Sequence, residues 1–387
     1  MKVDEPKTSL IFFVDLSEQY KRLKSEIDSR IQKVLDHNRY VLGPEIAELE
    51  SELARFSGAQ HAIGCASGTD GLLMVLMALG VGRGDSVFTS PFSFISIAEV
   101  VQLLGATPVF VDIDPVTYNI DPKLLGMAIQ NELNSGQSKP KAVIPVDLFG
   151  IPADYDSINP VAKRFGLKVV EDAAQSFGAV YKEKRACSLA DYGVTSFFPS
   201  KPLGCYGDGG AIFTDNNQMA NTLKSIRVHG QADHSYDHPR LGINGRLDSL
   251  QAAVLLAKLT VFESELLARN KIAEKYTAGL KPFLVTPTVP YGSISAWAQY
   301  SVQAKSKEER KGLQDKLKES GIPTAVYYPV PLHLQPVFSH LGYKPVDFPV
   351  SERVCKRIFS LPMYPYLSLE TVDKIVSIVS KEFGTRG

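Results

Sequence analysis

An acid and a lysine, each at the end of an apolar run, are the residues in this sequence best suited to chemistry. Asp172 ends a run that begins at Lys168, and Lys201 follows the apolar run 192–198. A carboxylate can keep a pyridine nitrogen protonated, and a lysine amine can form a Schiff base with an aldehyde. Pyridoxal phosphate carries both groups, so Lys201 and Asp172 are the predicted catalytic residues of a site for this cofactor.

The residues around Lys201 favour the same interpretation. Four glycines follow it: Gly204, Gly207, Gly209 and Gly210. Glycines let a flat ring approach the backbone closely. A dinucleotide-binding loop is one alternative, but it requires G-x-G-x-x-G between a strand and a helix, whereas these glycines precede a predicted strand. A surface lysine beside a hairpin is the other. Gln175 and Ser196, at matching strand ends, favour the cofactor site.

A second candidate site precedes these strands in the chain. The segment Ser67-Gly68-Thr69-Asp70-Gly71 lies between an apolar run and a predicted helix that starts near Leu72. Amides at a helix N-terminus, with a hydroxyl beside them, bind anions. The alternative is an ordinary helix cap, in which Thr69 or Asp70 accepts from free amides. Both interpretations can hold together.

Two segments carry a resemblance to a known family. EDAAQSFGA (171–179) and TSFFPSKPLGCYGDGGA (195–211) resemble the sugar aminotransferases of the DegT/DnrJ/EryC1/StrS family, and the likeness extends from Phe13 to Met363. The resemblance implies an α/β fold of the pyridoxal phosphate-dependent aspartate aminotransferase type (fold type I). It also implies a homodimer with shared active sites.

The resemblance assigns roles in cofactor binding. Gly68, Thr69 and Ser196 would hold the phosphate, and Phe94 would stack on the ring face away from Lys201. Gln175 would contact the 3-hydroxyl group. Asn244 would reach across the dimer interface to the phosphate bound by the partner subunit.

The resemblance also implies a reaction. An amino group would pass from an amino acid, with glutamate expected, through the pyridoxamine phosphate form of the cofactor to a keto group of a nucleotide-linked sugar. The expected acceptor is a UDP-linked 3-keto N-acetylglucosaminuronate of bacterial surface-polysaccharide (lipopolysaccharide O-antigen) synthesis. A 4-keto deoxy-sugar nucleotide is the alternative. Tyr327, Tyr328 and His333 would line the sugar site of the neighbouring subunit. The planar fork of Arg246 suits a carboxylate, and an ion pair with Asp248 is the alternative.

The sequence gives less support to two other functions. Sugar dehydratases of the same family replace the lysine by histidine, whereas this chain has Lys201. A regulatory or scaffold protein could keep the fold and bind the cofactor without turnover. The complete set of Asp172, Gln175, Ser196 and Lys201 argues against that function.

The elements that must position these residues alternate between strand and helix. Two amphipathic helices are predicted at 17–36 and from about 44 to 56. Seven strands are then predicted. Four are the apolar runs at 62–65, 86–89, 108–111 and 142–146, and three lie at 168–171, 192–198 and 211–214. This alternation predicts a seven-stranded, mostly parallel sheet covered on both faces, with ligands at the carboxyl ends of its strands. A long helix at 247–265 is expected to connect two domains, 1–255 and a smaller C-terminal α/β domain, 256–387.

Composition excludes several classes of protein. The 42 basic and 42 acidic residues balance, so no global charge favours nucleic acid or a membrane surface. No apolar run approaches the ~20 residues of a membrane span, and the first residues do not resemble a signal peptide. The four cysteines form no C-x-x-C pair, which indicates reduced thiols in a cytoplasmic protein. His229, His234 and His238 match no zinc pattern, so no metal site is expected.

Overall fold

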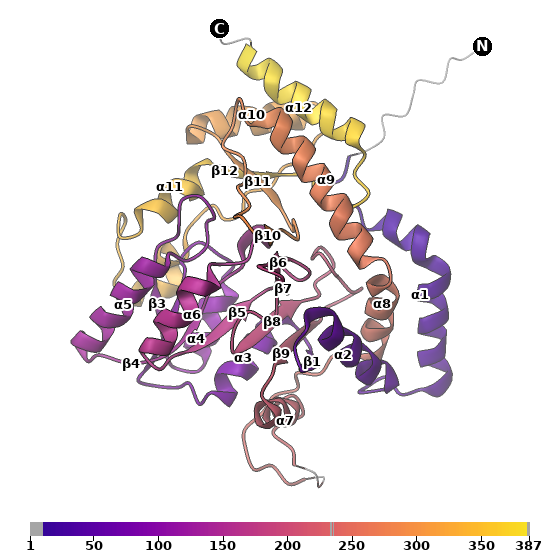
Figure 1. Ribbon diagram of the computed structural model, residues 1–387, viewed down its shortest axis with the longest axis vertical. Helices are drawn as coiled ribbons and strands as arrows, with labels where there is room; N and C mark the ends of the chain where they lie inside the picture. The colour runs from indigo at the N-terminus through magenta and orange to yellow at the C-terminus, as the bar shows by residue number, and fades with distance from the viewer. Residues whose placement is uncertain (1–10, 233, 235, 385–387) are drawn as a thin grey trace.

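The computed structural model describes residues 11–232, 234 and 236–384, which are layered around one large sheet (Figure 1). The sheet has the strand order β1-β9-β8-β5-β4-β2-β3. In chain order its strands are β1 (His61–Cys65), β2 (Asp85–Thr89), β3 (Thr107–Phe110), β4 (Lys139–Ile144), β5 (Lys168–Asp172), β8 (Tyr192–Ser196) and β9 (Gly210–Thr214). Four neighbouring pairs are parallel, while β9 is antiparallel to β1 and β8. The predicted seven-stranded, mostly parallel sheet is confirmed.

Helices cover both faces of the sheet. Successive residues of a strand point to opposite faces, so each strand contributes apolar side chains to both cores. Val87 packs into a core with α3 (Gly68–Ala78), α4 (Ser96–Leu103) and α7 (Asn217–Ile226). Phe88 packs on the other side with α5 (Pro122–Ser135) and α6 (Tyr155–Arg164). Phe213 continues that side with α2 (Pro44–Ser57) and α8 (Ser249–Leu259). The sheet is therefore a rigid, buried platform whose strand ends carry the candidate residues.

The N-terminal helix α1 (Ser17–His37) packs along α8. Its buried face consists of Leu23, Ile27 and Val34, which recur at helical spacing. Leu23 and Ile27 share a small apolar core with Val254 and Ala257 of α8. Asn38 ends α1 in the left-handed conformation, which asparagine tolerates better than most residues.

The C-terminal part of the chain has a core of its own. Its elements are α9 (Phe262–Leu280), β11 (Tyr300–Gln303), α10 (Lys307–Glu319), α11 (Pro349–Arg357), β12 (Ile358–Leu361) and α12 (Leu369–Gly384). Strands β11 and β12 are antiparallel, and Tyr276, Tyr300 and Phe359 lie at the centre of this core. In Figure 1, α9, α10 and α12 lie above the large sheet. The predicted connecting helix is broken at Thr260, so α8 and α9 are separate helices.

Several short elements complete the fold. A small three-stranded sheet joins β10 (Ser293–Ile294), β6 (Val180–Tyr181) and β7 (Lys184–Arg185). The 3-10 helices in the described part of the chain are η1 (Leu148–Gly150), η2 (Leu332–Leu334) and η3 (Pro336–Leu341). The four cysteines are buried and unpaired. No helix in the described part of the chain is long and apolar enough to cross a membrane.

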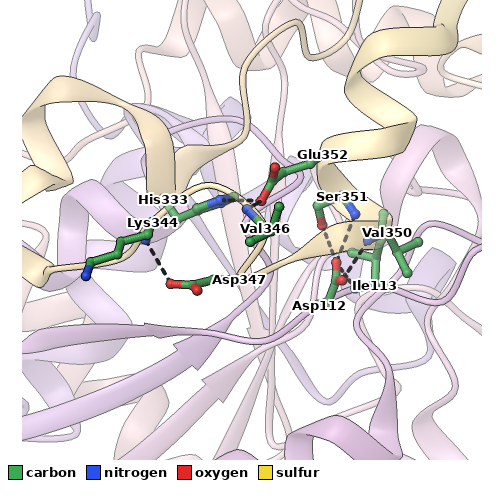
Figure 2. Close-up of polar contacts among 9 residues, drawn as sticks. All are labelled: Asp112, Ile113, His333, Lys344, Val346, Asp347, Val350, Ser351 and Glu352. Carbon is green, nitrogen blue, oxygen red and sulfur yellow. Dashed lines mark hydrogen bonds and ion pairs between the residues drawn. The ribbon is translucent and has the colours of Figure 1, made fainter. Parts of the chain in front are cut away.

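One C-terminal segment packs back onto the large sheet. Leu332, Phe338 and Phe348 belong to the same core as Val87 and α3. Figure 2 shows how Asp112, just beyond β3, contacts the first turn of α11: its carboxylate accepts from the amides of Val350 and Ser351, each at 2.9 Å. The domain boundary near residue 255 stays a prediction. This segment, which follows the predicted boundary, packs in the same core as the strands of the large sheet.

Candidate active site

A cavity of about 420 Å³ lies at the carboxyl ends of the parallel strands. Nine of the predicted site residues line it: Gly68, Thr69, Phe94, Asp172, Gln175, Ser196, Lys201, Tyr327 and Tyr328. Three others, Asn244, Arg246 and His333, are not among its lining residues. The structure thus brings together the candidates on the large sheet with two tyrosines from a distant segment.

Asp172 is the last residue of β5, and its side chain is buried. Its backbone is held in the sheet by a hydrogen bond from its amide to the carbonyl of Pro145 at 2.9 Å. One carboxylate oxygen accepts from the amide of Ala174 at 3.1 Å. Burial raises the pKa of Asp172, and the amide of Ala174 and the charge of Lys201 oppose that shift. A buried acid close to a lysine can hold a proton on a bound heterocycle.

Lys201 lies in a tight loop between β8 and β9. The loop turns back on itself, since Lys201 N–H donates to the carbonyl of Phe198 and Cys205 N–H to that of Phe197. Gly204 is required there, because a Cβ atom would lie 2.5 Å from the Pro199 oxygen. Burial lowers the pKa of the Lys201 ammonium, and the charge of Asp172 opposes this effect. Easier loss of the proton favours the neutral amine that a nucleophile needs.

The predicted phosphate site is formed by the start of α3 and the end of β8. A Cβ atom on Gly68 would lie 3.0 Å from the Ser196 Cβ, so these two residues are neighbours. Gly210 allows this approach, because a Cβ atom there would lie 2.7 Å from the Gly68 nitrogen. The helix cap is Ser67, whose hydroxyl accepts from Asp70 N–H at 3.0 Å. The expected alternative cap by Thr69 or Asp70 is therefore wrong, and Thr69 lines the cavity.

Gln175 is fixed by hydrogen bonds at both ends of its amide. Its Oε1 accepts from the backbone amide of Phe149 at 2.8 Å. Its Nε2 donates to the Tyr328 hydroxyl at 3.1 Å. Phe94 has 56% of its surface exposed at the cavity, so a flat apolar face is available there for a ring.

The two tyrosines lie in their own subunit's cavity. They were expected to line the site of the neighbouring subunit, but Tyr327 and Tyr328 line the cavity that contains Lys201 of the same chain. A hydrogen bond holds the segment that contains these tyrosines beside the cavity. Leu332 N–H donates to the carbonyl of Pro91 at 2.7 Å, and Pro91 is three residues before Phe94. This contact between distant parts of the chain has no local sequence signal.

His333 lies away from the cavity lining, in the cluster drawn in Figure 2. Its side chain has no exposed surface, and its Nε2 lies 3.3 Å from Glu352 Oε1. Its ring packs 4.6 Å from that of Phe348. Burial lowers the pKa of His333, and Glu352 opposes this shift. A role for His333 in substrate binding stays a prediction that this arrangement does not favour.

Asn244 and Arg246 lie on the segment that enters α8. Asn244 is exposed and Arg246 half-buried. The segment runs beside the phosphate loop, since Ala66 N–H donates to the Gly245 carbonyl at 3.0 Å. Among the described residues, Arg246 makes no ion pair, so the alternative pairing with Asp248 is absent. Its guanidinium group is available to another molecule.

The cavity also contains residues that sequence reasoning missed. Ser93, Asp208 and Gln299 line it. Gln299 comes from the C-terminal part of the chain, and its Oε1 is buried without a hydrogen-bond partner in the structure. A lone glutamine next to a strand carries no chemical signal in a sequence. No group of three or more potential metal ligands occurs among residues 11–232, 234 and 236–384.

Nearly the whole chain is similar to known proteins. Residues 21–380 match the family model of the DegT/DnrJ/EryC1/StrS aminotransferase family. UDP-2-acetamido-2-deoxy-3-oxo-D-glucuronate aminotransferase of Pseudomonas aeruginosa is 50% identical over 372 residues, which cover 96% of this chain and 100% of that protein. A pleiotropic regulatory protein of Geobacillus stearothermophilus is 44% identical over 372 residues, covering 95% of this chain and 97% of that protein.

Solved structures of aminotransferases are similar to this chain over nearly its whole length. A DegT/DnrJ/EryC1/StrS aminotransferase from Brucella abortus superposes with a TM-score of 0.93 at 47% identity, covering 96% of this chain and 99% of that chain. A Streptococcus pneumoniae protein described as a sugar aminotransferase, solved in its PLP form, has a TM-score of 0.85 at 26% identity. That match covers 92% of this chain and 96% of the other.

Proposed function

This chain belongs to the DegT/DnrJ/EryC1/StrS aminotransferase family, and from that premise we propose which amino transfer it catalyses. The enzyme uses pyridoxal phosphate to move an amino group from an amino acid, glutamate, to the ketone of UDP-2-acetamido-2-deoxy-3-oxo-glucuronate. The observation that carries the proposal is the cavity in which Lys201 and Asp172 lie with Tyr327 and Tyr328. The similarity to the Pseudomonas aeruginosa enzyme supports the choice of sugar.

The residues of the cavity fit the cofactor. A buried acid, a half-buried lysine, a helix N-terminus with hydroxyl groups and an open aromatic face match its ring nitrogen, aldehyde, phosphate and ring. When bound, pyridoxal phosphate withdraws electrons from the carbon that carries the amino group and stores that group between donor and acceptor. Asp172 would hold the proton on the ring nitrogen, and Gly68, Thr69 and Ser196 would hold the phosphate.

Lys201 has two tasks in this scheme. Its neutral amine would hold the cofactor through the aldehyde, a condensation that releases water, and once free again it would move a proton at the substrate carbon. Its lowered pKa favours both tasks. Gln175 would accept or donate at the 3-hydroxyl group, held in place by Phe149 and Tyr328.

The proposal includes a homodimer with shared sites. Asn244 and Arg246 are accessible yet do not line the cavity of their own chain, so their proposed ligands lie in a neighbouring subunit. Phe94 and Phe198 line the cavity and are 56% and 51% exposed. A partner subunit would cover these apolar rings, which would otherwise remain in water. In that assembly Asn244 contacts the partner's cofactor phosphate and Arg246 the sugar carboxylate.

The setting follows from the proposed substrate. Nucleotide sugars for bacterial surface polysaccharides, such as the lipopolysaccharide O-antigen, are made in the cytoplasm, and we assign the enzyme to that compartment and pathway class. Four buried, unpaired thiols agree with a reducing compartment.

One experiment tests the function. Purified protein would be mixed with pyridoxal phosphate and glutamate, then with a panel of keto-sugar nucleotides that includes the 3-keto uronate and 4-keto deoxy sugars. Amination of the 3-keto uronate above the others is expected, and preference for a 4-keto sugar would contradict the assignment. A regulatory protein, the function named for the Geobacillus relative, would show no change of absorbance with glutamate and no product. The Lys201→Ala variant is the control.

A further inference from the structure

Two fully buried carboxyl groups touch each other behind the strand end that carries Asp172. Asp147 follows β4, and Glu171 lies in β5; both are 0% exposed. The backbone brings them together, because Asp147 N–H donates to the Asp172 carbonyl at 3.0 Å. Their carboxyl groups share a side-chain hydrogen bond.

The hydrogen-bond donors around the pair are neutral. Asp147 accepts from Ala153 N–H, Tyr155 O–H and Ser176 O–H, each at 2.8 Å. Glu171 accepts from the amides of Cys187 at 2.6 Å and Leu189 at 3.1 Å. Neither carboxyl group forms an ion pair with a Lys, Arg or His of the described chain.

A hydrogen bond between two carboxyl groups needs a proton on one of them. Two ionised carboxylates in contact, without a cation and away from water, would repel each other strongly. Burial raises the pKa of Asp147 to about 7, and burial together with the charge of Asp147 raises that of Glu171 well above its usual range. The geometry therefore requires one shared proton at neutral pH.

The pair connects the loops that hold the predicted cofactor residues. Ser176, bonded to Asp147, follows Gln175 directly in the turn after Asp172. Asp147 also holds Ala153, at the end of the loop whose Phe149 amide donates to Gln175 at 2.8 Å. Asp147 thus contacts both segments that fix the Gln175 side chain.

Glu171 fixes the segment before β8. Its oxygens hold the amides of Cys187 and Leu189. The Cys187 backbone packs so closely on Gly193 of β8 that a Cβ atom there would lie 2.5 Å from the Cys187 Cα. Strand β8 ends at Ser196, in the predicted phosphate site. Both carboxyl groups therefore support the cavity from behind without lining it.

We propose that Asp147 and Glu171 share a single proton and act as positioning residues for Asp172 and Gln175, so that loss of the proton weakens cofactor binding. The inference rests on the proposed function for one point, that Asp172 and Gln175 contact pyridoxal phosphate. Its structural part, the shared proton, does not depend on that function.

The direction of the pH effect follows from linkage. Free carboxyl groups lose their protons near roughly pH 4, whereas the folded pair keeps one at higher pH. The charge of Asp147 raises the pKa of Glu171, so Asp147 ionises first, near its pKa of about 7, and Glu171 keeps the shared proton. Stability from the pair is fully present below the unfolded pKa values and is lost as pH rises through the two raised folded pKa values. Three other titratable groups face the pair: Tyr155, Cys187 and Asp172. Burial raises all three pKa values, and Lys201 opposes the shift of Asp172.

Asp147→Asn is the decisive variant, because an amide can donate to Glu171 without a shared proton. Two quantities would be measured from pH 6 to 9 in wild type and variant: the dissociation constant for pyridoxal phosphate, and the melting temperature without added cofactor. We expect wild-type affinity to fall at least fivefold more across this range than that of Asp147→Asn. The melting temperature of the variant should rise relative to wild type as pH increases.

Asp156→Asn is the matched control, since Asp156 is exposed and pairs with Lys182. It should follow the wild-type pH profile. Equal pH profiles of wild type and Asp147→Asn would overturn the proposal. If Asp147→Asn does not fold, Glu171→Gln makes the same test from the other side, and failure of both neutral variants to fold would also overturn it.

The outcomes separate this proposal from the proposed function. Wild-type protein that binds no pyridoxal phosphate at any pH would contradict the function, while the difference in melting temperature would still report the shared proton. A shared proton seen in melting, with no effect of Asp147→Asn on the pH dependence of cofactor binding, would overturn the positioning role.

Discussion

Gln175 donates a hydrogen bond from Nε2 to the Tyr328 hydroxyl at 3.1 Å, across a sequence separation of 153 residues. The bond joins the end of the central sheet to a segment of the C-terminal part, and both residues line the cavity. Burial raises the pKa of Tyr328, so the phenol stays protonated at neutral pH. Because its oxygen already accepts from Gln175, its own proton is free to reach a ligand.

The first prediction concerns this bond. Tyr328→Phe leaves the Gln175 amide without its acceptor, and an unpaired buried donor costs about 1–3 kcal/mol. Affinity for pyridoxal phosphate should fall roughly five- to tenfold or more, which corresponds to about 1 kcal/mol at least. Titration of the cofactor, followed by absorbance, measures it. Tyr327→Phe is the matched control, since no hydrogen bond of its hydroxyl group to another described residue is seen. Equal losses in the two variants would show that the Gln175 bond does not matter.

Sequence reasoning could predict the large-sheet half of the site for a physical reason. Parallel strands end at one edge of a sheet, so Asp172, Ser196 and Gly68 had to meet there once the alternation of strands and helices was recognised. Strand register is set by local apolar patterns, and these patterns are strong in β2, β4 and β5.

The other half depends on contacts that no local pattern encodes. Tyr328 reaches the cavity because Leu332 is bonded to Pro91, and because Asp112 holds α11. The burial of His333 follows from the same folding-back of the chain. The contact between Asp147 and Glu171 arises from the pairing of β4 with β5, and two isolated acids in a sequence do not reveal it.

The second prediction is that Lys201→Ala folds but does not turn over. Removal of the half-buried Lys201 side chain enlarges the cavity and takes away the counter-charge of Asp172. The variant should bind pyridoxal phosphate without a covalent bond and lack the visible band of a protonated Schiff base. Absorbance spectra and product analysis check this. Lys201→Arg keeps the charge and should be equally inactive; transamination by either variant would remove Lys201 from the mechanism.

The third prediction separates cofactor binding from catalysis. Asp172→Asn should bind the cofactor but lose most activity, because a neutral amide cannot hold the pyridinium proton. The charge-assisted bond alone is worth about 1.5–3 kcal/mol, or roughly ten- to hundredfold in rate. Kinetics under saturating cofactor measure the loss, with the exposed Asp156→Asn as control. Turnover close to wild type in Asp172→Asn would transfer this role to another acid.

The fourth prediction is about stability (Figure 2). The Asp112 carboxylate accepts from Ile113, Val350 and Ser351 amides and from the Ser351 hydroxyl. Asp112→Ala removes a helix cap, worth about 0.5–2 kcal/mol, and leaves buried donors unpaired. The free energy of unfolding in urea should fall by about 2–3 kcal/mol. Asp347→Ala, which loses only an exposed bond to the Lys344 amide, should change it little; a similar loss in both variants would contradict the capping role.

The fifth prediction tests the sugar carboxylate. Arg246 is half-buried and unpaired among the described residues, so its guanidinium fork can bind a uronate with two parallel bonds. Loss of such a pair costs about 2–5 kcal/mol in a desolvated site. Arg246→Ala should lose most of its kcat/KM on the 3-keto uronate and much less on a keto sugar with a methyl group at C6. Equal losses on both substrates would make Arg246 structural.

Mixing two inactive variants shows whether Arg246 acts across a dimer interface. In a shared site, one subunit supplies Lys201 and its partner supplies Arg246. A hybrid dimer then has one site with both changes and one site with neither. Random reassociation makes about half of the dimers hybrids, so roughly one quarter of all sites should be intact on the keto-uronate. If Arg246 instead serves the cavity of its own chain, every site keeps one damaged residue, and the mixture stays as inactive as its components.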